Sequence, residues 1–192
     1  MKKMIAITGG IGSGKSTALH IFEKMGYPVF SCDEIYREVI QSPSYIEEIS
    51  QNFPECIIDG KIEKKRLAEI VFKNKEKLLI LNNIAHPLIM ECLLKNMQEC
   101  QHTVVFAEVP LLFEGNFEAL FNEVIVIMRD KEQRILSIMR RDNISRVEAL
   151  SRIATQFDYD NASERFKNCN AIVLQNNGSP EDLKEKIQAL NF

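Results

Sequence analysis

A glycine-rich segment near the N-terminus has the residue types that hold a phosphate chain. Residues 9–16 read GGIGSGKS and match the pattern GxxxxGK[ST]. Glycines let the backbone curl so that its N–H groups face a β-phosphate with no Cβ in the way. Lys15 supplies a mobile cation for the β- and γ-phosphates, and the Ser16 hydroxyl is a hard ligand for Mg²⁺. An accidental glycine-rich turn would give this match in on the order of 1% of chains of this length.

The segment therefore predicts a site for ATP with Mg²⁺ where a strand gives way to a helix. The positive N-terminal end of that helix points at the same phosphates. The residues expected to bind the nucleotide are Gly10, Ile11, Gly12, Ser13, Gly14, Lys15, Ser16 and Thr17.

Two carboxylates could complete a phosphoryl-transfer site. Residues 104–108, VVFAE, resemble a Walker B strand, and Glu108 could hold a water on Mg²⁺, although many buried strands end in a charge. Asp33 follows the second predicted strand, where a small-molecule kinase can hold a general base near the γ-phosphate. The alternative for Asp33 is a cap on the helix that follows it.

Arginines on a later helix could close over the transferring phosphoryl group. Arg134 and Arg141 are seven residues apart and share a helix face, so a lid could carry their charges to the phosphates. The alternative for Arg141 is a solvated charge, favoured at a helix C-terminus. A GTPase would also carry an Asn-Lys-x-Asp element, and the closest string, NKEK at residues 74–77, has no Asp.

Five short apolar runs predict the strands that must position these residues. They lie at residues 4–8, 29–31, 103–109, 123–128 and 171–174. Helical patterns separate them, at residues 16–25, 130–141, 145–156 and from Ser179-Pro180 onward, with a capping box at Ser145 and Glu148. This alternation predicts an α/β fold with a doubly wound, five-stranded parallel sheet of the P-loop kinase type.

Between the second and third strands the pattern is helical. Helices are predicted at residues 34–41, 45–52, 64–73, 75–83 and 87–99, with Asp59-Gly60 as a tight turn between two of them. We interpret this stretch as a mostly helical insert.

Composition limits the partners. The net charge of −3, from 24 basic and 27 acidic residues, gives no basic excess for a nucleic acid. No stretch approaches the roughly 20 apolar residues of a membrane span. The five cysteines show no CxxC spacing, so a metal site is not indicated, and an odd count fits reduced thiols in the cytoplasm.

Several segments together resemble the dephospho-CoA kinases. They are ITGGIGSGKST, SCDEI, DGKIEKKRLAEIVF, the His-Pro pair at 86–87, VPLLFE at 109–114, RRD at 140–142, Gln156 and QNNGS at 175–179. Their order and spacing fit that family over nearly the whole chain. The resemblance implies transfer of the ATP γ-phosphate to the ribose 3′-hydroxyl of dephospho-CoA, the last step of coenzyme A synthesis.

The resemblance also implies an internal organisation. Within one kinase domain, 1–192, the nucleotide core covers residues 1–31, 102–129 and 168–192. A CoA-binding helical subdomain covers 32–101, and a lid covers 130–167. The oligomeric state is left open.

The resemblance assigns further candidate residues and exposes some departures. It favours Asp33 as the base and Arg140 and Arg141 as phosphate contacts. Substrate contacts are expected at Leu112, Phe113 and Glu114, against loop packing. One is also expected at His86, against a structural role at a helix entry or as a core contact. The family usually has Asp at position 108, Arg at 137, Asp-Ala-Asp at 31–33 and Ala-Asp at 169–170. This chain has Glu108, Ser137, Ser31-Cys32-Asp33 and Cys169-Asn170 there, so Arg134 or Arg140 is expected to substitute for the missing lid arginine.

Two other functions stay open at this point. One is a P-loop kinase for another hydroxylated acceptor. The other is an ATP-dependent switch or binding module with no acceptor, which would hydrolyse ATP or do nothing whatever acceptor is offered.

Overall fold

The structure, a computed structural model, describes residues 2–192 as two compact units. Among these residues, unit 1 comprises 2–31 with Glu99–Phe192, and unit 2 comprises Cys32–Gln98. The helical insert predicted over residues 32–101 covers the same stretch as unit 2, which ends three residues earlier. The separation of a lid, 130–167, from the rest of unit 1 stays a prediction.

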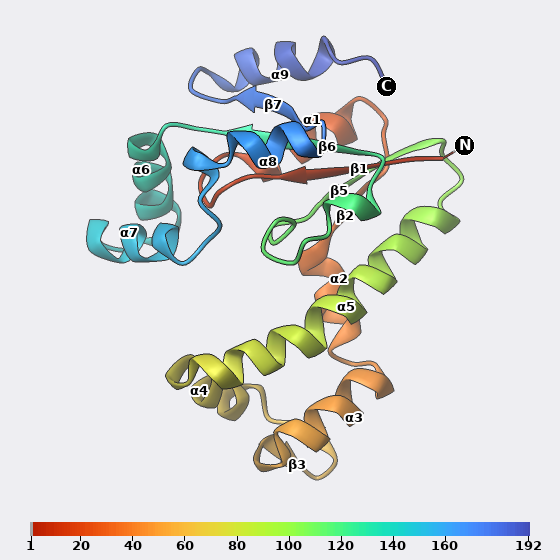
Figure 1. Cartoon of the computed structure of the whole chain (residues 1–192), viewed down its shortest axis with the longest axis vertical. Helices are drawn as coiled ribbons and strands as arrows, with labels where there is room; N and C mark the ends of the chain where they lie inside the picture. Colours follow the sequence, from red (N-terminus) through yellow and green to blue (C-terminus); the bar gives the residue numbers. More distant parts are fainter. Residues whose placement is uncertain (1) are drawn as a thin grey trace. The chain divides into compact units, whose positions relative to one another are not determined.

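Unit 1 is built on a parallel sheet whose central strand leads into the glycine-rich segment. The strand order is β2-β5-β1-β6-β7 (Figure 1), and every neighbouring pair is parallel. The strands are β1 Lys3–Thr8, β2 Val29–Ser31, β5 Val104–Glu108, β6 Glu123–Met128 and β7 Ile172–Gln175. All five predicted strands are thereby confirmed. Parallel strands that are covered on both faces have nearly continuous apolar sequences, and this is why the five strands could be recognised from the sequence.

Helices of unit 1 connect these strands. They are α1 Lys15–Lys24, α6 Lys131–Asp142, α7 Arg146–Ala154, α8 Ser163–Asn168 and α9 Pro180–Gln188. The capping box of Ser145 and Glu148 forms as predicted, and Ser179 caps α9 with Pro180 in its first turn. Helix α8 and the 3₁₀ turns Glu118–Leu120 and Tyr159–Asn161 were not predicted, because they are too short to show a helical repeat.

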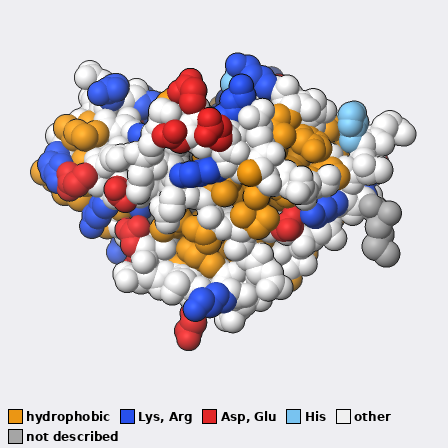
Figure 2. Space-filling view, turned by 90° about the horizontal axis from the view of Figure 1, so that it is seen from above, with side chains coloured by type: hydrophobic (Ala, Val, Ile, Leu, Met, Phe, Trp, Pro, Cys, Tyr) orange, Lys and Arg blue, Asp and Glu red, His pale blue; other side chains and the backbone are white. Residues whose placement is uncertain are grey.

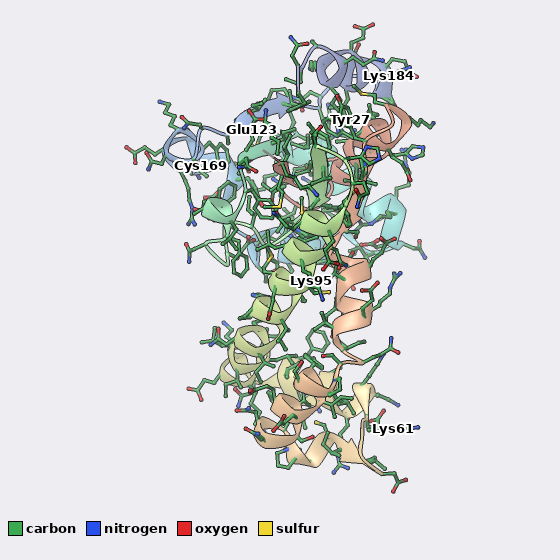
Figure 3. The ribbon with its side chains drawn as sticks, turned by 90° about the vertical axis from the view of Figure 1, so that its right-hand side faces the viewer. Tyr27, Lys61, Lys95, Glu123, Cys169 and Lys184 are labelled. Atoms are coloured by element: carbon green, nitrogen blue, oxygen red, sulfur yellow. The ribbon has the colours of Figure 1, made fainter. Side chains whose placement is uncertain are left out.

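An aromatic cluster forms part of the core of unit 1. Phe22 on α1 stacks on Phe106 of β5 with ring centroids 4.0 Å apart. Tyr27, labelled in Figure 3, meets Phe106 edge-on at 5.2 Å, and Phe192 does the same from the other end of the chain. Such pairs add about 0.5–1.5 kcal/mol each beyond burial, and here they fix α1 and the C-terminus against β5.

Unit 2 consists of four α-helices and a small hairpin among its described residues. Its elements are α2 Cys32–Val39, α3 Pro43–Asn52, a 3₁₀ turn Pro54–Cys56, β3 Ile57–Ile58, β4 Lys61–Ile62, α4 Lys64–Lys73 and α5 Lys75–Glu99. Asp59 and Gly60 both have positive φ, 49° and 73°, and close the hairpin, from which Lys61 projects (Figure 3). The turn was predicted correctly, but the strands were missed because two residues each carry no pattern.

Helix α5 corrects the prediction of two separate helices. It runs unbroken from Lys75 to Glu99 with Pro87 inside it. The two-helix prediction followed from proline, which removes a hydrogen bond and costs an interior helix about 3 kcal/mol. Burial of Ala85, Met90 and Leu93 on both sides of the proline keeps the helix continuous.

Helix α5 is also long and apolar enough to cross a membrane by length and composition, with mean hydropathy 1.3 in its most apolar window. This differs from the expectation that no stretch of the sequence approaches a membrane span. Length and composition do not distinguish a membrane span from a helix packed within a folded unit, and one such helix is weak evidence.

On the face seen in Figure 2, acidic and basic side chains are interspersed around hydrophobic patches, in agreement with the balanced net charge.

Candidate active site

The glycine-rich segment joins β1 to α1 in a backbone shape that only glycine adopts readily. Gly9, Gly12 and Gly14 have φ of 147°, 78° and 100°. Gly14 is also the N-cap of α1, and no side chain accepts a hydrogen bond there. The first N–H groups of α1 therefore have no side-chain cap, and they suit an anion such as a phosphate. The buried Ser13 hydroxyl has no hydrogen-bond partner among the described residues, which is a further donor for such a ligand.

Lys15 lies at this loop, largely buried. Its Nζ donates to the carbonyl oxygens of Gly9 at 2.9 Å and Gly10 at 3.3 Å. Burial lowers the pKa of the Lys15 amine, and the charges of Arg134 and Arg141 lower it further, while those of Glu108 and Glu114 raise it. The Lys15 ammonium is therefore influenced electrostatically by two arginines and two glutamates of unit 1.

Four side chains from distant parts of unit 1 hold the loop and its entrance. Gln156 Oε1 accepts from the Ile11 N–H at 2.7 Å, and Arg134 Nε donates to the Ile11 carbonyl at 3.1 Å. Asn176 Nδ2 donates to the Ser13 carbonyl at 2.7 Å. The hydroxyls of Tyr159 and Thr8, at the end of β1, are 2.9 Å apart. The contacts of Gln156, Tyr159 and Asn176 were not predicted, although Gln156 and the segment of Asn176 carried the family resemblance.

Two of the loop glycines leave space for Arg134. A Cβ on Gly10 would lie 2.4 Å from Arg134 Nη2, and one on Gly12 would lie 2.8 Å from the Arg134 carbonyl oxygen. Arg134 is 3% exposed and also faces Asp160 at 3.6 Å. Gly10 and Gly12 thus serve the packing of helix α6 as well as the curvature of the loop.

The arginines of α6 have different surroundings. Arg134 is buried against the loop, whereas the Arg141 side chain is 60% exposed and donates to both oxygens of Asp142, at 2.7 and 3.0 Å. Arg152 from α7 also pairs with Asp142. Arg140 is exposed. The Asp142 carboxylate therefore joins the end of α6 to α7.

Arg129, which directly follows β6, lies beside Ser137, the position where the family usually has an arginine. Its Nη1 donates to the Ser137 hydroxyl at 3.1 Å, and its Nε donates to Gln133 at 3.0 Å. A guanidinium is therefore present beside position 137 although it comes from another element. The predicted substitutes were Arg134 or Arg140, and Arg129 was not considered.

Two of the three predicted substrate contacts after β5 lie in the core of unit 1, and the third, Glu114, is exposed. Leu112 and Phe113 are buried. Phe113 stacks on Phe157 with ring centroids 5.0 Å apart and also contacts Tyr159 and Phe166. Glu114 accepts a hydrogen bond from the Phe157 N–H at 2.9 Å. The structure thus favours the loop-packing alternative for Leu112 and Phe113, because burial leaves their side chains no surface for a substrate.

Asp33 lies in the first turn of α2 and lines a cavity in unit 2. The helix begins at Cys32, so Asp33 is inside it and the predicted capping position is wrong. The cavity measures about 520 Å³ and is lined by Asp33, Tyr36, Arg37, Ile40, Tyr45, Ile62, Lys64, Leu67, Ala68, Val71, Phe72, Leu78 and Leu81. Its lining is mostly apolar, and the charged residues in it carry both signs: Asp33, Arg37 and Lys64.

His86 is half-buried in the interior of α5. The predicted position at a helix entry is therefore wrong, and the structural alternative of a core contact stays a prediction. A contact with substrate stays a prediction.

The donor set suits a metal that arrives with its nucleotide. The described residues contain no group of three or more His, Cys, Asp or Glu side chains that could hold a metal ion alone. Mg²⁺ usually takes few protein ligands and fills its shell with phosphate oxygens and waters. Ser16, in the first turn of α1, and Glu108, paired in register with Ile7 of β1, are the protein groups that fit this pattern.

Comparison with known proteins agrees with this site and fold. A family model for dephospho-CoA kinase matches residues 3–182. The dephospho-CoA kinase of Fusobacterium nucleatum is 36% identical over 187 residues, covering 96% of this chain and 95% of the relative. The crystal structure of TT1252 from Thermus thermophilus matches with a TM-score of 0.79 at 33% identity, over 98% of this chain and 95% of that one. Dephospho-CoA kinase from Campylobacter jejuni matches with a TM-score of 0.69 at 32% identity, over 98% and 94% of the two chains. On these matches, which span almost its full length, the chain belongs to the dephospho-CoA kinase family.

Proposed function

We propose that this protein transfers the γ-phosphoryl group of ATP to the ribose 3′-hydroxyl of dephospho-CoA, giving ADP and coenzyme A. The observation that carries the proposal is the family match over residues 3–182, joined to a loop whose glycines, buried lysine and uncapped helix end suit a phosphate chain. Phosphoryl transfer depends mainly on positioning and charge stabilisation, which these groups provide.

In this proposal the residues of the loop bind and orient the donor. The N–H groups at the start of α1 and the Lys15 ammonium hold the β- and γ-phosphates in line with the acceptor oxygen. Arg141, with Arg140 beside it, supplies positive charge to the equatorial oxygens as the bond to ADP breaks. Ser16 would be a ligand of bound Mg²⁺ and Glu108 would hold one of its waters, and the ion would neutralise negative charge on the phosphates.

Asp33 is the proposed general base. A ribose hydroxyl is a poor nucleophile while it keeps its proton, and an oriented carboxylate can accept that proton as the O–P bond forms. The cavity beside Asp33 is the proposed acceptor site. Its apolar walls suit the pantetheine arm, and Arg37 and Lys64 on its lining suit the acceptor's phosphates.

An acceptor panel tests this function. The protein with ATP and Mg²⁺ is offered dephospho-CoA, AMP or adenosine, and products are identified by mass and by the position of the new phosphate. Dephospho-CoA should yield coenzyme A, and the short acceptors should react much more slowly because they lack the binding energy that positions the hydroxyl. Equal turnover of AMP would favour a kinase for another acceptor, and hydrolysis alone would favour the switch class.

We also propose that the enzyme works in the cytoplasm. All five cysteines are free thiols in the structure. Free thiols in this number are typical of proteins in a reducing compartment.

A further inference from the structure

Ile11, within the phosphate loop, has both of its backbone polar groups bound by side chains. Its N–H donates to Gln156 Oε1 at 2.7 Å, and its carbonyl accepts from Arg134 Nε at 3.1 Å. Gln156 comes just after α7 and Arg134 comes from α6. One loop residue is therefore held by α6 and by the chain that follows α7.

A second contact from the same segment anchors the entrance of the loop. Tyr159, three residues after Gln156, places its hydroxyl 2.9 Å from that of Thr8, and both residues are buried. Burial raises the pKa of Tyr159 to about 12, so the phenol keeps its proton at neutral pH and can serve as donor to Thr8. The stretch from 156 to 159 thus holds the loop at Thr8 and at Ile11.

A loop with this composition needs such support. Its glycines make it more flexible than an ordinary loop when nothing holds it. If the protein does not fix the conformation in advance, the ordering must be driven by nucleotide binding, and affinity falls. The Ile11 N–H that donates to Gln156 is not available to a phosphate. We therefore expect this hydrogen bond to stabilise the conformation of the loop.

We propose that Gln156 is a positioning residue, which keeps the phosphate loop in its nucleotide-binding conformation by accepting the Ile11 N–H. The inference rests on the proposed function only in taking ATP as the phosphoryl donor. Gln156 acts on the loop in the ground state and the transition state alike. Its loss therefore weakens ADP and ATP equally and raises KM for ATP, while kcat at saturating ATP is retained.

The test is Gln156→Met, which keeps the length of the side chain and removes the amide oxygen. ADP affinity is measured by calorimetry, beside the thermal midpoint without nucleotide and the steady-state constants. We expect the Kd for ADP and the KM for ATP to rise about threefold to tenfold, the equivalent of one net hydrogen bond. The matched control is Thr155→Ala, which removes a hydrogen bond of 3.0 Å to the Arg152 carbonyl within the same segment and should leave ADP affinity unchanged.

A second variant, Gln156→Glu, keeps an acceptor oxygen but adds a negative charge near the phosphates. High salt screens that repulsion, so its ADP affinity should approach that of the parent protein at about 1 M salt. A failure to recover in salt would count against the inference even if the methionine variant does not fold. Parental ADP affinity in folded Gln156→Met, equal weakening by Thr155→Ala, or no recovery of Gln156→Glu in salt would each overturn the inference. Because ADP binding needs no acceptor, such a failure leaves the proposed acceptor untouched, and an inactive acceptor assay leaves this result standing.

Discussion

At the scale of single residues, Lys15 holds a charge that its surroundings disfavour. Burial lowers the pKa of its amine, so the folded chain binds its proton less tightly than the unfolded chain. Between the two pKa values the unfolded state binds more protons, and the stability of the fold rises with pH. At a pH below both values, the protonated lysine therefore carries its full desolvation cost.

This leads to opposite effects on activity and stability for Lys15→Met. Removing the cation from the developing charge on the β,γ-bridge should lower kcat by about 10²-fold or more, as for the loss of one preorganised donor. The thermal midpoint should rise at a pH below both pKa values, because a neutral side chain of similar length has no charge to desolvate. Initial rates and thermal unfolding of the two proteins check both. Wild-type turnover by the folded variant would show that the loop has been misread.

Asp33 offers a second test at this scale. Asp33→Asn keeps the size of the side chain but cannot accept a proton, so kcat should fall by about 10²–10⁴-fold, with the low end favoured because phosphoryl transfer depends more on positioning. ATP affinity should hardly change.

The competing role for Asp33 is electrostatic, since it lies in the first turn of α2. That role predicts a retained rate and a loss of about 0.3–1 kcal/mol of stability from the helix dipole. Single-turnover rates measured beside thermal midpoints separate the two. An unchanged rate would direct the search for a base to Glu108.

At the scale of elements, the junction of α6 and α7 is where the exposed arginines are tested. Arg141 pairs with Asp142, which Arg152 also binds. A planar guanidinium can bridge two phosphate oxygens as it bridges this carboxylate, and lysine cannot reproduce that fork. Arg141→Ala and Arg141→Lys should therefore both lower kcat.

Arg140→Ala, one residue away and exposed, is the companion variant, with kcat and thermal midpoint measured for all three. Parental turnover in both alanine variants would mean that the charge comes from Arg134 or Arg129 or from backbone donors. Loss of stability without loss of rate would mean that Arg141 only joins the two helices.

The elements also show what the sequence could predict. Strands such as β1 and β6 were predicted because burial on both faces leaves a continuous apolar run, and the loop was predicted because its chemistry is local. Helix α5 was not predicted as one helix, because proline usually ends a helix and the sequence does not reveal the packing that keeps Pro87 inside this one. Gln156, Tyr159 and Asn176 form hydrogen bonds with residues more than 140 positions away in the sequence. No local sequence pattern indicates such pairs.

At the scale of the whole molecule, the division into two units predicts where each ligand acts. Hydrogen exchange followed by mass spectrometry should show ADP protecting amides around the loop and the start of α1, in unit 1. Coenzyme A should protect α2 and α4, which line the cavity of unit 2. Protection by coenzyme A confined to unit 1 would contradict the proposed acceptor site.

The distance along the chain between the loop and its supports has a consequence for biosynthesis. The 163 residues between Ser13 and Asn176 take about 8–33 s to make at roughly 5–20 residues per second. During that interval β1 has been translated, but its neighbours β5 and β6 appear only about a hundred residues later. Ile5 and Ile7, fully buried at the end, are left without their sheet. ATP in the cell therefore gives the nascent chain no early assistance, because the segment that would bind it becomes competent only when translation is nearly finished.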